Sequence, residues 1–162
     1  MCRRFVEIVE ALSRACGFLA GLLLTVAMVV VCQMILMRYL FRAPTIWQTD
    51  AVVFSATAAI FMGAPYVLLK KAHVGVDVVQ LLFSPRNRLR LARLGAVFGL
   101  LFCLIMTVAT AIYFFEAVDG GWTTASIAKV PLWMPVGPML LGFALLSLQY
   151  VAELIKLQGD PA

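Results

Sequence analysis

The sequence predicts an all-α integral membrane protein with four transmembrane helices and with both termini in the cytoplasm. All 13 Lys and Arg residues and all 8 Asp and Glu residues lie outside four uncharged runs, at 15–37, 51–69, 94–115 and 130–152. A helix needs about 20 apolar residues to cross the hydrocarbon core, and a charge at its centre costs about 2.5–3.5 kcal/mol. The chain is also 64% hydrophobic, whereas about half of the residues in a soluble domain are apolar.

The four runs predict a single four-span membrane domain over residues 1–162. They take up more than half of the 162 residues, and the segments between them are shorter than the roughly 50 residues that an independent soluble domain needs. We therefore expect no separate catalytic domain and no enzyme activity.

The positive charges predict the orientation in the membrane. Cytoplasmic segments next to transmembrane helices carry an excess of Lys and Arg. Ten cations flank the termini and the second connection, and three lie on the other side, at Arg38, Arg42 and Lys129. This bias places both termini and the second connection in the cytoplasm. The net charge of +5 is explained by contact with anionic membrane lipids, so no nucleic acid partner is expected.

Two segments outside the spans predict amphipathic helices that lie at the membrane surface. Before the first span, the polar residues of segment 4–14 recur at helical spacing, opposite an apolar face. Between the second and third spans, segment 73–84 carries one polar stripe on an otherwise apolar helix. Such helices lie flat at the interface. Ser84 and Pro85 then resemble an N-cap and a first-turn proline, which predicts that a new helix begins there.

The entries to the second and fourth spans carry distinct signals. Thr45 and Gln48 match a capping box, which would place Asp50 in the first turns of a helix, where the helix dipole favours a carboxylate. Trp47, three residues earlier, would anchor the interface. The fourth span opens with three prolines within 131–138, so we expect an irregular entry and regular helix only from Pro135 or Pro138.

The spans carry little chemistry of their own. They hold scattered Ser, Thr and Gln residues, whereas ion-coupled transporters usually keep ionisable groups near the midplane. His73, the only histidine, stands four residues before Asp77 and could act as a proton-linked contact or simply orient the connection. One histidine excludes bis-histidine haem ligation, and neither a cofactor nor a metal site is indicated.

Small residues recur four apart in three of the spans, as the glycine pairs Gly17 and Gly21 and Gly95 and Gly99, and as Ser55, Ala59 and Gly63 in the second span. Such pairs let helix backbones approach closely. They predict tight packing either inside the protein or against a partner.

An ordered set of motifs runs along nearly the whole chain. The motifs are Arg-Tyr-Leu-Phe at 38–41, Trp-Gln-Thr-Asp at 47–50, Met-Gly-Ala at 62–64, the His73 to Asp77 segment, the basic stretch 86–93 and Val-Pro-Leu-Trp at 130–133. This set resembles the small permease subunit (DctQ-like) of tripartite ATP-independent periplasmic (TRAP) transporters. The chain has Asp50 where the family usually has Glu after Trp-x-x, which shortens the reach of that carboxylate.

The resemblance implies a non-catalytic scaffold subunit of a sodium-coupled transporter that takes up carboxylate-type solutes. Its implied partners are a large permease subunit, which carries the substrate, and a periplasmic solute-binding protein. It also implies that Arg38, Trp47, Asp50, His73 and Asp77 contact a partner subunit. The alternative is a small membrane-anchor subunit of a redox or other multi-subunit complex, which would need haem ligands or a quinone pocket.

Overall fold

The computed structural model describes residues 2–70 and 85–159. This part of the chain forms four α-helices: α1 (Cys2–Leu40), α2 (Gln48–Leu69), α4 (Pro85–Asp119) and α5 (Trp133–Gly159). Each of them is long and apolar enough to cross a membrane. The prediction of an all-α protein with four spans is confirmed.

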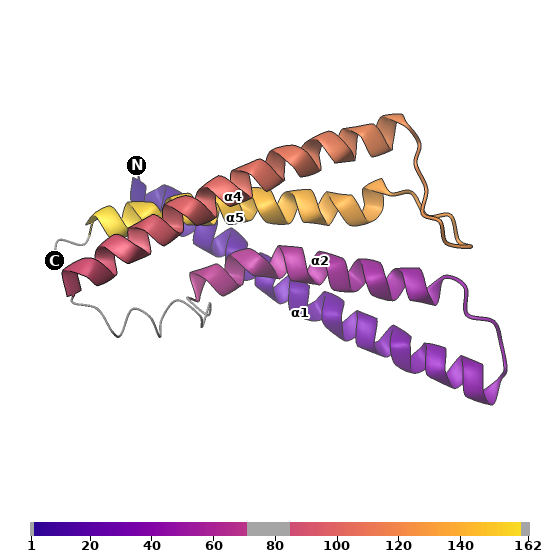
Figure 1. Ribbon diagram of the computed structural model, residues 1–162. Coiled ribbons are helices and arrows are strands. Elements are labelled where there is room, and N and C mark those ends of the chain that lie inside the picture. Colours follow the sequence, from indigo (N-terminus) through magenta and orange to yellow (C-terminus); the bar gives the residue numbers. More distant parts are fainter. Residues whose placement is uncertain (1, 71–84, 160–162) are drawn as a thin grey trace.

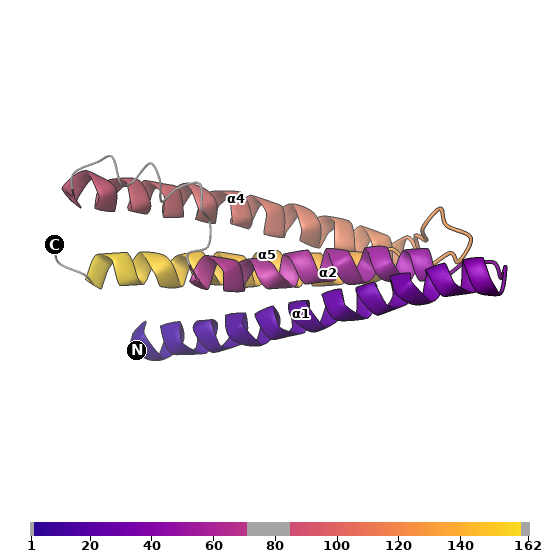
Figure 2. The same ribbon diagram turned by 90° about the horizontal axis from the view of Figure 1, so that it is seen from below.

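The helices form two hairpins, α1 with α2 and α4 with α5, that meet through α2 and α5. The N-terminal part of α1 also reaches α5, whereas α4 packs mainly on α5. Both views place α1 and α4 on opposite sides of the central α2 and α5 pair (Figures 1 and 2). The outer faces of α1 and α4 therefore expose large apolar side chains such as Phe18, at 79%, and Phe98, at 68%.

The two ends of the protein differ in what they carry. Both termini lie at one end, which we call the terminal end, where α2 finishes and α4 begins (Figure 1). The opposite end, which we call the loop end, carries connections 41–47 and 120–132. This arrangement agrees with four consecutive crossings. The placement of the terminal end in the cytoplasm remains a prediction from the charges.

Helix α1 differs from the expected break between a surface helix and a span. Residues 4–14 are helical, but they continue into the span as one helix of 39 residues. No proline or glycine lies between Cys2 and Cys16, so nothing in the backbone interrupts the helix. The predicted surface helix over 73–84 lies outside the described residues, but α4 begins at Pro85, where the restart was expected.

Two predicted helix starts are wrong in detail. Trp47, not Thr45, is the N-cap of α2, and no side chain caps the helix there. Helix α5 begins at Trp133, before Pro135, and includes Pro138 in its interior. Pro135 lies in the first turn, where backbone N–H groups have no intrahelical partner, and Pro138 removes only one helical hydrogen bond. The expected irregular entry is therefore shorter than the sequence suggested.

The small residues mark the closest approaches between helices. A Cβ at Gly17 would clash with the Tyr66 ring, and one at Gly99 would clash with the Tyr150 ring. Gly21 and Gly95, the other members of the two pairs, would meet nothing within 4 Å. One glycine of each pair is thus used inside the protein, and the other faces outward.

Candidate functional site

The predicted site residue Asp50 lies in the first turn of α2 and is bound by the connection between α4 and α5. The Ser126 hydroxyl donates a hydrogen bond to Asp50 Oδ2 at 2.6 Å, a length typical of a hydroxyl on an ionised carboxylate. These residues are 76 positions apart in the chain. The contact therefore joins the two hairpins at the loop end.

The proton positions in this cluster follow from the number of donors. Ser126 has one hydroxyl hydrogen, which Asp50 accepts, so the 2.8 Å contact between Ser126 Oγ and Thr124 Oγ1 needs Thr124 as its donor. Thr124 Oγ1 in turn accepts the backbone N–H of Val130 at 3.1 Å. The chain of donors runs from Val130 through Thr124 and Ser126 to Asp50. Such chains polarise in one direction and strengthen each bond.

The 120–132 connection is held in shape by its own backbone. Thr123 and Pro131 form an isolated antiparallel bridge, flanked by bonds from Thr124 N–H to the Val130 carbonyl at 2.8 Å and from Leu132 N–H to the Trp122 carbonyl at 2.9 Å. This short hairpin presents Thr124 and Ser126 together. The Ser126 hydroxyl that donates to Asp50 is therefore preorganised.

The other predicted residues at the loop end stand apart from this cluster. Arg38 lies in the last turn of α1 and is exposed, and Trp47 is 54% exposed. Neither forms a hydrogen bond or an ion pair with Asp50 in the part of the chain that the structure describes. Arg38 and Trp47 thus remain available at the surface. His73 and Asp77 lie outside the described residues.

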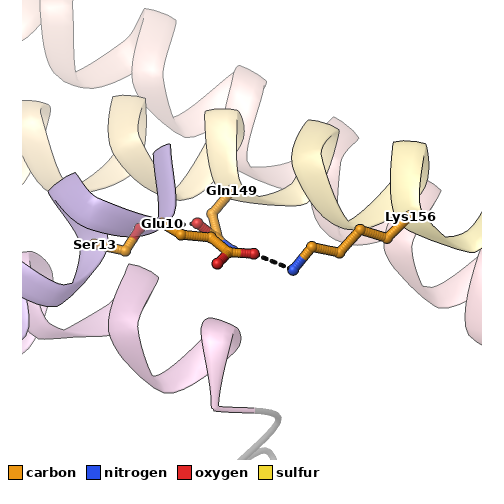
Figure 3. Close-up of polar contacts among 4 residues, drawn as sticks. All are labelled: Glu10, Ser13, Gln149 and Lys156. Carbon is orange, nitrogen blue, oxygen red and sulfur yellow. Dashed lines mark hydrogen bonds and ion pairs between the residues drawn. The ribbon is translucent and has the colours of Figure 1, made fainter. Parts of the chain in front are cut away.

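A second polar contact, which the sequence did not predict, joins α1 to α5 near the terminal end (Figure 3). The Ser13 hydroxyl donates to Gln149 Oε1 at 2.8 Å, and Glu10 forms an ion pair with Lys156. Ser13 and Gln149 are both 0% exposed. Gln149 Nε2 is buried without a hydrogen-bond partner. The presence of an amide inside the fourth span was the only sequence signal for this contact.

A third group of hydroxyls lies between α4 and α5. Thr107 donates to the Cys103 carbonyl at 2.7 Å, and Ser147 donates to the Phe143 carbonyl at 2.9 Å. Each hydroxyl has a single hydrogen, so the 3.5 Å contact between Thr107 and Ser147 cannot be a hydrogen bond at the same time. Both hydroxyl groups therefore donate to carbonyl groups of their own helices.

The terminal end is closed by one more contact between α4 and α5. Arg93 donates from its guanidinium group to the Leu157 carbonyl at 2.8 Å. A cation near the last carbonyls of a helix is favoured by the helix dipole. Arg93 therefore caps α5 from the neighbouring helix.

The polar contacts described above have a structural role. The bonds link helices or connections, and each acid in them has a donor or a cation as its partner. In residues 2–70 and 85–159, no three His, Cys, Asp or Glu side chains come together in a way that could hold a metal ion.

Comparison with known proteins gives a family for the chain. Residues 27–159 match the family described as tripartite ATP-independent periplasmic transporters, DctQ component. The chain is 22% identical over 138 residues to the C4-dicarboxylate TRAP transporter small permease protein DctQ of Vibrio cholerae serotype O1. That alignment covers 72% of this chain and 60% of the relative. The comparison with solved structures found no match.

The family match covers most of the chain, including the second, third and fourth spans and the Asp50 cluster. Members of this family are transporter components of the inner membrane and not enzymes, which decides against a redox-complex anchor. The chain belongs to the DctQ family of small permease subunits of TRAP transporters.

Proposed function

We propose that this subunit is a non-catalytic scaffold, a single membrane domain that supports a large permease subunit during sodium-coupled uptake of a carboxylate-type solute. The sodium coupling and the scaffold role rest on the resemblance to TRAP transporters. The carboxylate class is supported by the name of the Vibrio cholerae relative, which refers to a C4-dicarboxylate. That relative is longer, and this chain aligns with 60% of its length.

The observation that carries the scaffold role is the use of polar groups within the spans. The four uncharged runs contain no acid or base, and the buried hydroxyl groups of Ser13 and Ser147 bond within this chain. A transport site near the midplane would need polar or ionisable groups open to a substrate or an ion. We therefore assign the transport pathway to the large permease subunit.

The outward-facing glycines support a partner inside the membrane. Gly21 and Gly95 lie in long apolar helices, where glycine costs about 1 kcal/mol relative to alanine. A Cβ added at either position would meet nothing within 4 Å. Close approach by a helix of the large subunit would account for both glycines.

The loop end supports a role for Arg38 and Trp47 in contact with a periplasmic solute-binding protein. Both side chains are exposed at the same end of the protein as the hairpin that binds Asp50. Asp50 itself is already bound by Ser126, so we assign it to positioning this surface. His73 and Asp77 would brace the second connection against the third span or against the large subunit.

The test of the scaffold role is purification of the subunit, expressed with its genomic neighbours, followed by native mass spectrometry. We expect a one-to-one complex with a large multi-span permease. A lone subunit or a homo-oligomer would contradict the proposal.

The contact residues are tested in that complex. Trp47→Ala and Arg38→Ala should lower solute uptake without loss of the large subunit, because they act at the binding-protein surface. His73→Ala should weaken the association with the large subunit. If Asp50→Asn and His73→Ala left both assembly and uptake unchanged, the roles given to these two residues would be wrong.

A further inference from the structure

We propose that Ser126 and Asp50 form a latch that sets the separation of the two helix hairpins at the loop end. The hairpins are the α1 and α2 pair and the α4 and α5 pair. The latch is a property of this subunit, and it does not depend on the partners assigned above.

The first support is the position of the other contacts between the hairpins. Ser13 with Gln149 and Glu10 with Lys156 join them near the terminal end. Near the middle, a Cβ on Gly142 would clash with the Phe61 carbonyl. The Phe61 ring also packs against Phe143, with ring centroids 5.1 Å apart.

The second support is the spread of the hairpins beyond that point. Figure 1 shows α2 and α5 diverging toward the loop end, and the 120–132 connection extends beyond the start of α5 on the side that faces α2. On the α2 side, Thr49 contacts Met34 of its own hairpin. The hydrogen bond from Ser126 to Asp50 thus connects the two hairpins at the end where α2 and α5 diverge.

The third support is the chemistry of the bond. Its acceptor is a carboxylate oxygen, its length is 2.6 Å, and its donor, the Ser126 hydroxyl, accepts in turn from Thr124. A hydrogen bond to a charged group of this kind shifts a two-state equilibrium by about 10- to 100-fold. The close approach of Gly142 to the Phe61 backbone provides the pivot, because a side chain as small as a Cβ would not fit between the two helices there.

The latch predicts two states of the subunit. When Ser126 is hydrogen-bonded to Asp50, the two hairpins are held together at the loop end. Without that bond, the hairpins separate there by rotation about the pivot. Since packed interfaces switch between discrete arrangements and amplify small local changes, loss of the Ser126 hydroxyl group should shift the population between the two states.

The experiment measures distances between spin labels on the full-length chain in lipid nanodiscs. One pair of labels spans the loop end, at Val53 of α2 and Met134 of α5, both of which are exposed. A second pair spans the terminal end, at Ile8 of α1 and Leu148 of α5, also exposed. The four native cysteines are first replaced, and the background protein must keep its thermal stability.

We expect Ser126→Ala to add a longer-distance population at the loop-end pair and to leave the terminal-end pair unchanged. Ser126→Thr keeps the donor and should restore the short distance, which separates the latch from simple misfolding. Ser147→Ala removes a buried serine that bonds only to its own helix and serves as the matched control. An unchanged loop-end distance in Ser126→Ala, or an equal change at both pairs, would overturn the latch.

Discussion

A buried amide inside a transmembrane helix is costly unless both of its polar atoms have hydrogen-bond partners. In Gln149 only one of the two atoms has a partner. Its Oε1 accepts the Ser13 hydroxyl, whereas its Nε2 is buried without a partner. Interhelical hydrogen bonds in membranes contribute about 0.6 kcal/mol on average, and the strongest contribute about 1.7 kcal/mol. At the scale of the residue, the hydrogen bond joins α1 to α5, but the free-energy cost of burying Gln149 Nε2 is not compensated.

This imbalance predicts a non-additive pair of substitutions. Ser13→Ala should lower the stability by about 1–2 kcal/mol, because both ends of the Gln149 amide are then unpaired. Adding Gln149→Leu should recover most of that loss, since the buried polar group is removed with its partner. Thermal unfolding of both single variants and of the double variant in detergent measures the coupling. Additive effects would show that the two side chains do not interact.

A second residue-scale prediction concerns the backbone at the end of α1. Arg42 has a φ of 46°, and the N–H of Ala43 bonds to the Met37 carbonyl at 3.1 Å. The positive φ places Arg42 in the left-handed region just after the helix, where glycine is the usual residue. Arg42→Gly should therefore raise the stability by up to about 1 kcal/mol, because the left-handed conformation costs a residue with a Cβ about 1–2 kcal/mol.

The control for Arg42→Gly is the same change at Arg38, inside the last turn of α1. Glycine there should lower the stability by up to about 1 kcal/mol, because it weakens a helix. Melting temperatures of the two variants in one detergent should move in opposite directions. A fall in both would mean that Arg42 makes a contact that outweighs its strained backbone.

At the scale of the elements, the sequence predicted what depends on local pattern. The uncharged runs gave the four spans, because a charge inside the hydrocarbon is costly wherever it falls. Helix starts were less accurate: the capping box at Thr45 is absent, and Trp47 is the N-cap. The bonds from Ser13 to Gln149 and from Ser126 to Asp50 join residues 136 and 76 positions apart. Local periodicity carries no information on such pairs.

The close approach of α2 and α5 gives the prediction for the elements. Gly142→Ala should lower the stability by about 1–3 kcal/mol, because its Cβ would clash with the backbone of Phe61. Gly95→Ala is the matched control, since its Cβ would meet nothing within 4 Å and alanine favours a helix. Unfolding of the isolated subunit in detergent measures both. Equal losses of stability in the two variants would show that the effect comes from replacing glycine in a helix and not from the clash between α5 and α2.

At the scale of the whole molecule, the open layer of helices suits a protein that is solvated by lipid. Lipid chains are as apolar as leucine, so no hydrophobic force drives these helices into a closed bundle. The outer faces of α1 and α4 keep side chains such as Phe18 and Phe98 largely exposed. The polar contacts at both ends, together with the glycine contacts, therefore determine how the helices are arranged.

The orientation of that layer is the last prediction, and it depends on charge alone. In the sequence, ten of the 13 Lys and Arg residues flank the termini and the second connection, and the other three, Arg38, Arg42 and Lys129, flank the two loop-end connections. With the native cysteines replaced, Ala125→Cys in the loop-end hairpin should react with a membrane-impermeant maleimide added from the periplasm. Arg90→Cys at the start of the third span should react only after the inner membrane is permeabilised, because both positions are exposed but lie on opposite sides. If Arg90→Cys alone were labelled in intact spheroplasts, the topology would be the reverse of the predicted one. Arg38, Trp47 and the Asp50 latch would then lie on the cytoplasmic side, where no periplasmic protein could reach them.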